Sequence, residues 1–218
     1  MTLIKSIFMA FFALLSLALA PAMAQDADTA ANDPDGAFAF ISELSSNAIK
    51  VLDDPQLTQD ERNDEFRRLL REGFDLDYIG RLVLGRHARN ANKNQLESYK
   101  SVFPEYVLQI YSNRLKERGD ETFEVDSTTP AGKRDLYVRS RIVRPDGPDV
   151  AADWRVRKIE GAFRIVDLKI EGISMAITQR DEFSAKVNAD GIDALITFMR
   201  EQTGTDTPSA SAPISTAN

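Results

Sequence analysis

Apolar residues recur every three or four positions over the first half of this chain, which is the period of an amphipathic helix. Four blocks show this period. Asp33-Pro34 opens the first, with proline at the first helical position, and Asp75 caps the third. Thr58 and Glu61 form a capping box at the start of the second. The pattern predicts helices over 34–53, 58–73, 75–85 and 94–118.

From about Phe123 the period changes to two, and apolar residues alternate with charged ones. This alternation predicts antiparallel strands with one apolar and one solvated face. Turns are predicted at Pro145–Pro148 and at Glu160-Gly161. Four strands are therefore expected, around residues 123–125, 136–142, 150–159 and 162–170.

The fourth strand carries apolar residues in both phases. Val166, Leu168 and Ile170 are predicted to share the face that the other strands bury, while Phe163 and Ile165 point to the opposite face. A bulge or bend is predicted directly after this strand, at Glu171-Gly172.

Two more helices are expected after the strands, one from Thr178 and one after Asp190. This order predicts an α+β fold, in which a four-stranded antiparallel sheet is covered by N-terminal and C-terminal helices. Pro104 lies inside the fourth helix and predicts a kink, so this helix cannot lie flush along a sheet. We expect the gap to form an apolar pocket, filled by side chains or by a ligand.

The first 24 residues predict a secretory signal peptide. Lys5 gives the positive start, residues 6–19 are uncharged and mostly apolar, and Ala22-Met23-Ala24 is a cleavage site, so the mature chain begins near Gln25. The alternative is a membrane anchor, but the apolar run is shorter than the ~20 residues that span a bilayer.

The rest of the chain has the length of one domain. Its ends are polar and rich in small residues, which predicts disorder. The expected division is a signal peptide over 1–24, a disordered lead-in over 25–34, a single domain over 35–202 and a disordered tail over 203–218.

Composition excludes several classes of protein. The chain has no cysteine, which excludes disulfides, thiol catalysis and thiolate metal sites. Its formal net charge is -7, whereas nucleic-acid binding needs a basic surface. An acidic protein is also repelled on average by anionic leaflets, so we expect only transient membrane contact.

No catalytic set is recognisable, and we expect neither a metal nor a cofactor. His87 is the only histidine, which argues against a catalytic triad or a histidine zinc site. Asp167 and Glu171, four residues apart on a strand, stand roughly 13 Å from each other, too far to act on one bond. The protein is therefore predicted not to be an enzyme.

Three arginines, Arg81, Arg86 and Arg89, lie close together after Tyr78. They are either solvated charge that compensates a helix C-terminus or a contact for an anionic head group or an acidic partner.

Several motifs together resemble the MlaC family of periplasmic phospholipid-binding proteins, also known as toluene-tolerance auxiliary transport proteins. The motifs are F-D-L-D-Y-I-G-R-L-V-L-G-R over 74–86, L-E-S-Y-K-S-V-F-P-E-Y over 96–106, D-W-R-V over 153–156, G-A-F-R-I-V-D-L-K-I-E-G-I-S over 161–174, R-D-E-F over 180–183 and D-G-I-D-A-L-I over 190–196.

The resemblance implies a pocket for acyl chains and a soluble periplasmic carrier. This carrier would shuttle phospholipid between an outer-membrane lipoprotein complex and an inner-membrane ABC transporter, and so maintain the lipid asymmetry of the outer membrane. A hopanoid-associated branch resembles the same family, which leaves the lipid class open. Two further classes of protein stay open: a small periplasmic enzyme on a cone-shaped sheet fold, and an interaction module with a fully packed core.

The expected lipid-binding residues are apolar members of alternating strands or of helical stripes. They are Leu82, Tyr106, Ile110, Leu136, Val138, Trp154, Val156, Val166, Leu168 and Met175.

Overall fold

The computed structural model describes residues 33–115 and 121–204. The expected signal peptide, the lead-in up to residue 32 and the tail from residue 205 lie outside the described residues, so their predicted properties stay predictions.

Six α-helices and one five-stranded sheet make up the described chain. The helices are α1 (Pro34–Asp53), α2 (Gln59–Gly73), α3 (Leu76–Leu84), α4 (Lys93–Leu115), α5 (Met175–Asp190) and α6 (Ile192–Thr203), with a 3-10 helix, η2 (Gly85–Arg89), after α3. The strands are β1 (Thr122–Ala131), β2 (Asp135–Val143), β3 (Val150–Ile159), β4 (Ala162–Ile170) and β5 (Ile173–Ser174). They pair antiparallel in chain order, which confirms the expected α+β fold.

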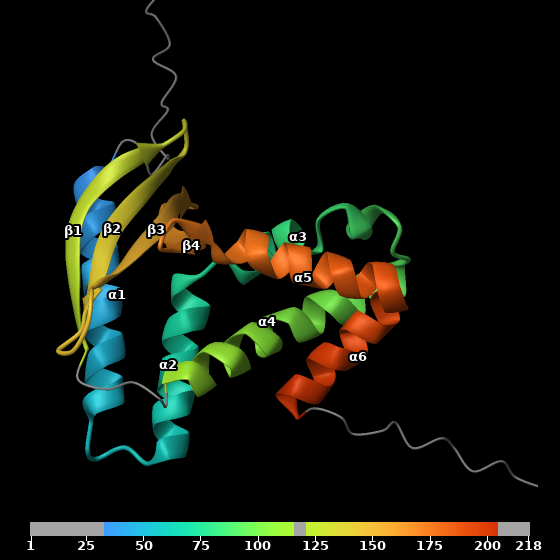
Figure 1. The fold of residues 1–218 in the computed structure, drawn as a ribbon, viewed down its shortest axis with the longest axis horizontal. Helices are drawn as coiled ribbons and strands as arrows, with labels where there is room; N and C mark the ends of the chain where they lie inside the picture. Colours follow the sequence, from blue (N-terminus) through green and yellow to red (C-terminus); the bar gives the residue numbers. More distant parts are fainter. Residues whose placement is uncertain (1–32, 116–120, 205–218) are drawn as a thin grey trace, which may run out of the picture.

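Figure 1 shows α1 running along the sheet, α2 standing beside it, and α3 to α6 extending away from the sheet. Helices α1, α2 and α3 begin where the sequence predicts them, because capping side chains satisfy their free N–H groups. Asp33 accepts from the amide of Gly36 at 3.0 Å, and Asp75 accepts from that of Tyr78 at 2.9 Å. Thr58 forms the predicted capping box.

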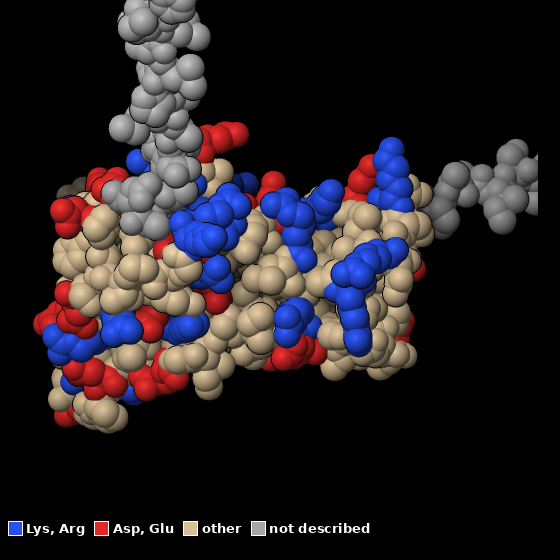
Figure 2. Space-filling view, turned by 90° about the horizontal axis from the view of Figure 1, so that it is seen from above, with Lys and Arg blue, Asp and Glu red and all other residues tan. Residues whose placement is uncertain are grey.

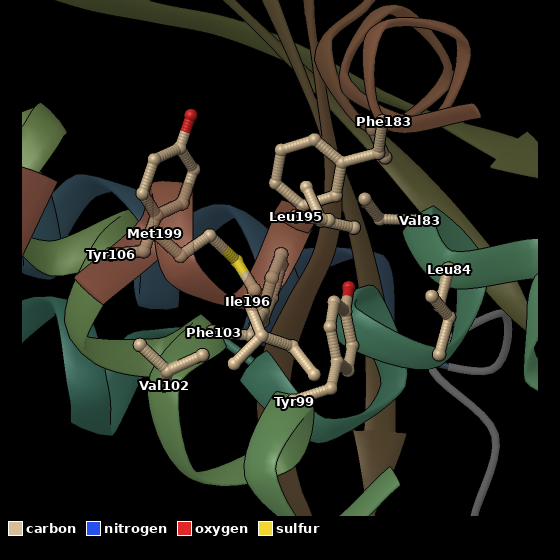
Figure 3. Close-up of a cluster of buried hydrophobic side chains, with 11 residues drawn as sticks. Val83, Leu84, Tyr99, Val102, Phe103, Tyr106, Phe183, Leu195, Ile196 and Met199 are labelled. Atoms are coloured by element: carbon tan, nitrogen blue, oxygen red, sulfur yellow. The ribbon is translucent and has the colours of Figure 1, made fainter. Parts of the chain in front are cut away.

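Two hydrophobic clusters stabilise the fold. The helical cluster joins α3, α4, α5 and α6, and Figure 3 shows its side chains converging from these helices. At its centre, the Phe103 ring stacks on Tyr99 at 5.4 Å between centroids and meets Phe183 edge-on at 6.4 Å. The absence of a side chain at Gly80 lets α3 approach Phe103, since a Cβ there would lie 2.9 Å from the ring.

The sheet cluster lies between α1 and the inner face of the sheet. Its buried members are Ala37, Ile41, Leu136, Val138, Val156 and Ile165. Each of them is at most 2% exposed, so this part of the core is filled by side chains.

The phase predicted for the start of β4 is wrong, because the strand contains a bulge. The register shifts so that Val156 pairs with Ile165 while Arg155 pairs with Asp167, and Val166 is the extra residue. Ile165 therefore faces α1 together with Val156. Leu168 pairs with Trp154 and follows the predicted phase.

The chain after β4 also differs from the expected pattern. Glu171 and Gly172 form a turn with φ of 51° and 79°, and the short strand β5 follows as a fifth strand. The helix predicted from Thr178 begins at Met175, because Ser174 caps it by accepting from the amide of Ile177 at 3.1 Å.

The outer face of the sheet carries a buried ion cluster. The Asp135 side chain is 2% exposed and accepts hydrogen bonds from Arg155 and Arg157, each with its nearest nitrogen at 2.7 Å or less. Burial alone would raise the pKa of Asp135, but the hydrogen bonds from the two guanidinium groups outweigh it and lower the pKa. The Arg157 guanidinium also lies 4.6 Å from the ring centre of Tyr78, which links α3 to the sheet.

Candidate ligand-binding cavity

A cavity of about 600 Å³ lies between the inner face of the sheet and helices α1 to α5. Its volume is within the ~300–1,000 Å³ typical of small-molecule sites. Most of its lining side chains are apolar, and they come from both hydrophobic clusters. The cavity is thus the space that the two clusters leave between them.

Helix α1 forms one wall. Ala37 and Ile41, in its N-terminal half, pack on the sheet, while Leu44, Ala48 and Leu52 continue the same stripe over the cavity. The stripe is thus longer than the sheet core that it covers. Helix α2 adds Phe66, Leu69 and Leu70, and α3 and α4 add Leu76, Ile79, Val83, Phe103, Val107 and Tyr111.

Trp154 forms the sheet wall together with Phe123, Ile142 and Leu168. Its indole N–H donates to the hydroxyl of Ser140 at 2.9 Å, and this hydroxyl donates to the carbonyl of Ala152 at 2.8 Å. The rings of Phe74 and Phe123 meet the indole edge-on, with centroids at 6.3 Å and 6.0 Å. The Trp154 side chain is thus oriented by one hydrogen bond and two ring contacts.

Few polar side chains border the cavity, and the charged ones among the described residues are Glu121 and Asp167. Asp167 accepts from the amides of Leu168 and Ala176 at 2.9 and 3.2 Å and from the hydroxyl of Ser174 at 2.7 Å. These bonds tie the first turn of α5 to β4. Asp167 is therefore a structural carboxylate.

The other candidate polar residues lie elsewhere and form structural contacts. Glu171 accepts from the amide of Ala151 at 2.6 Å. His87 shares a hydrogen bond of 2.9 Å with the hydroxyl of Ser184, which joins η2 to α5. Across residues 33–115 and 121–204, no group of His, Asp and Glu side chains could hold a metal ion.

Arg81, Arg86 and Arg89 are exposed. Figure 2 shows lysine and arginine side chains gathering in several patches on the upper face of the molecule, although the chain is acidic overall.

The structure brings three of the ten predicted site residues to the cavity: Trp154, Leu168 and Met175. Leu136, Val138 and Val156 lie in the sheet cluster, and Val166 is the bulge residue, 0% exposed. Leu82, Tyr106 and Ile110 belong to the helical cluster or pack against it. These seven do not border the cavity, because neighbouring side chains already fill the space that they face.

The contributions of α1 and α2 to the cavity were not predicted from the sequence. A signal for them exists, since the apolar stripes of both helices were recognised. Only the three-dimensional arrangement shows that part of each stripe faces a cavity.

The family model described as MlaC protein matches residues 42–201. The chain belongs to the MlaC family. This confirms the resemblance inferred from the motifs.

Two curated relatives match most of the chain. It is 27% identical over 180 residues to the Intermembrane phospholipid transport system binding protein MlaC of Haemophilus influenzae, covering 80% of this chain and 78% of the relative. It is 21% identical over 155 residues to the Toluene tolerance protein ttg2D of Pseudomonas putida, covering 71% and 70%.

A solved structure shares the fold. It is that of a phospholipid-binding protein from Ralstonia solanacearum in complex with a phospholipid, with a TM-score of 0.65 at 20% identity, covering 78% of this chain and 97% of that one. Within the part of the present chain that the structure describes, no helix combines the length and hydropathy needed to cross a bilayer.

Proposed function

We propose that this MlaC-family protein is a soluble periplasmic carrier that holds the acyl chains of a phospholipid in its cavity. The observation that carries the proposal is the apolar cavity between the two clusters, in a chain related to a phospholipid transport binding protein. Membership of this family makes the chain a carrier and not an enzyme.

The physical chemistry suits a carrier. Burial of one methylene is worth ~0.8 kcal/mol, so about 30 chain methylenes gain roughly 24 kcal/mol relative to water. A bilayer offers nearly the same gain. A cavity that matches the bilayer can therefore exchange lipid with it at little net cost.

We extend the proposal to the transport route. The carrier would take phospholipid between an outer-membrane lipoprotein complex and an inner-membrane ABC transporter, and so maintain outer-membrane asymmetry. This part rests on the family and on the name of the Haemophilus influenzae relative.

The contacts with lipid are assigned to the residues that line the cavity. Trp154, Leu168 and Met175 keep the role expected from the sequence, and Leu44, Ala48, Leu69 and Phe74 join them.

Native mass spectrometry of the purified protein tests the proposal. We expect complexes heavier than the polypeptide by the mass of a phospholipid, and the free polypeptide mass after denaturation. Hopanoid masses would support the alternative lipid class. A lipid-free protein that also takes up no phospholipid from vesicles would refute the carrier function.

A periplasmic location predicts that the signal peptide is removed from the mature chain. We expect N-terminal sequencing of the exported protein to find a start near Gln25, because Lys5, the apolar run and Ala22-Met23-Ala24 form a signal peptide. An exported protein that keeps Met1 would contradict this prediction.

A further inference from the structure

On the side of the sheet cluster, the cavity ends at one row of the sheet. Val138 pairs with Trp154, and Trp154 pairs with Leu168, so the three side chains form a row across the inner face. Trp154 and Leu168 line the cavity, whereas Val138 is 0% exposed in the sheet cluster. The next row, beneath α1, is filled completely.

On the other side of Trp154 the sheet carries small residues. Ser140 and Ala152 pair with each other there, are 3% and 1% exposed, and do not border the cavity. The indole reaches this row through its hydrogen bond to Ser140. The Trp154 side chain therefore lies over Ser140 and Ala152 and separates them from the cavity, which Ile142 borders again beyond this row.

Neighbouring groups hold the indole in this position. The Ser140 hydroxyl donates to Ala152, which leaves its oxygen free to accept from the indole. Phe123 and Phe74 meet the indole edge-on and themselves border the cavity. A bulky side chain above two small residues thus occupies space that a ligand would otherwise fill.

We propose that Trp154 is the specificity-determining residue that limits the length of the acyl chains this protein accepts. The inference rests on the proposed carrier function and specifies acyl-chain length as the ligand property for which the cavity selects. An acyl chain that reaches the indole cannot enter the space over Ser140 and Ala152. Each further methylene must stay in contact with water, which weakens binding of longer lipids.

The test uses Trp154→Ala, Trp154→Phe and Phe163→Ala as a matched control. Phe163 packs against the sheet cluster, stacks on Phe40 and does not border the cavity. Each protein is stripped of lipid and incubated with phosphatidylglycerol vesicles that contain equal amounts of lipids with 14, 16, 18 and 20 carbons per chain. Native mass spectrometry then gives the chain-length distribution of the bound lipid.

For Trp154→Ala we expect the preferred chain to lengthen by roughly two to four carbons, because an indole fills the space of several methylenes. Trp154→Phe should shift the preference less, and in the same direction. Phe163→Ala should keep the parent distribution even if its thermal stability falls. If Trp154→Ala does not fold, Trp154→Phe decides the question.

The inference is overturned if the folded Trp154 variants bind lipid with the parent distribution. It is also overturned if Phe163→Ala shifts the distribution equally. A parent protein that takes up no lipid at any chain length would instead refute the proposed function itself.

Discussion

Replacing Ala48 by Trp is expected to empty the cavity of lipid while leaving the protein folded. Ala48 lies on α1, borders the cavity and has its lining neighbours Leu44 and Leu52 one turn away on either side. An indole at this position would occupy space that the acyl chains need. Excluding only two methylenes costs about 1.6 kcal/mol, which exceeds a tenfold loss of affinity.

The measurement is the fraction of protein that carries lipid after purification, determined by native mass spectrometry. Ala39→Trp is the matched control, because Ala39 is exposed on the same helix and lies nine positions earlier, half a turn out of phase at about 100° per residue. The control should keep its lipid. Equal occupancy in Ala48→Trp and the parent would show that lipid does not occupy this cavity.

A tryptophan at Val138 would test something else. The alternation of the strand predicts Val138 in the pocket, but its side chain is 0% exposed within the sheet cluster. Val138→Trp would overfill a packed core and destabilise the fold, whatever the protein binds.

Removing the Asp135 carboxylate is expected to cost about 3 kcal/mol of unfolding free energy. The variant Asp135→Ala would leave Arg155 and Arg157 without their shared anion, and the Arg157 side chain is only 14% exposed. Breaking a buried ion cluster from one side leaves uncompensated charge, which is the costly case. Urea unfolding at pH 7 measures the effect.

Asp149→Ala is the control. Asp149 pairs with Arg141 at 3.3 Å, but its side chain is 39% exposed, so we expect a change below about 0.5 kcal/mol. Similar losses in both variants would contradict the role assigned to the buried cluster.

The same carboxylate predicts a dependence on pH. Its pKa in the folded protein lies below its value in the unfolded chain, about 3.9. Its contribution is therefore present above the unfolded pKa and is lost as the pH falls through the folded pKa. Stability of the parent should drop more steeply below about pH 4 than that of Asp135→Ala.

The sequence predicts the elements well because their signals are local. Asp33, Thr58 and Asp75 cap helices within a few residues of themselves, and the change of period near Phe123 separates helices from strands. The order of the strands follows because short turns join neighbours. These features need no information from distant parts of the chain.

The site is harder to predict because periodicity reports burial but not what covers a buried residue. Leu136 and Leu168 are both apolar members of alternating strands, yet α1 covers the first and a cavity adjoins the second. The bulge at Val166 adds a second difficulty, since one unpaired residue reverses the phase before it. Neither fact is encoded within a single element.

Strand β4 has a mechanical consequence for the cavity. The amide of Asp75, which precedes α3, donates to the carbonyl of Ile165 at 2.9 Å, and Asp167 holds the start of α5 through Ala176. Both attachments lie on β4, so this strand connects the helical cluster to the sheet (Figure 1).

Helices α2 and α4 also contact each other, below β4 in Figure 1. The ion pair between Arg71 and Glu105 joins these two helices, and its side chains are 58% and 41% exposed. An exposed pair of this kind stabilises little. The ion pair therefore adds little to the attachments that hold the helical cluster on β4.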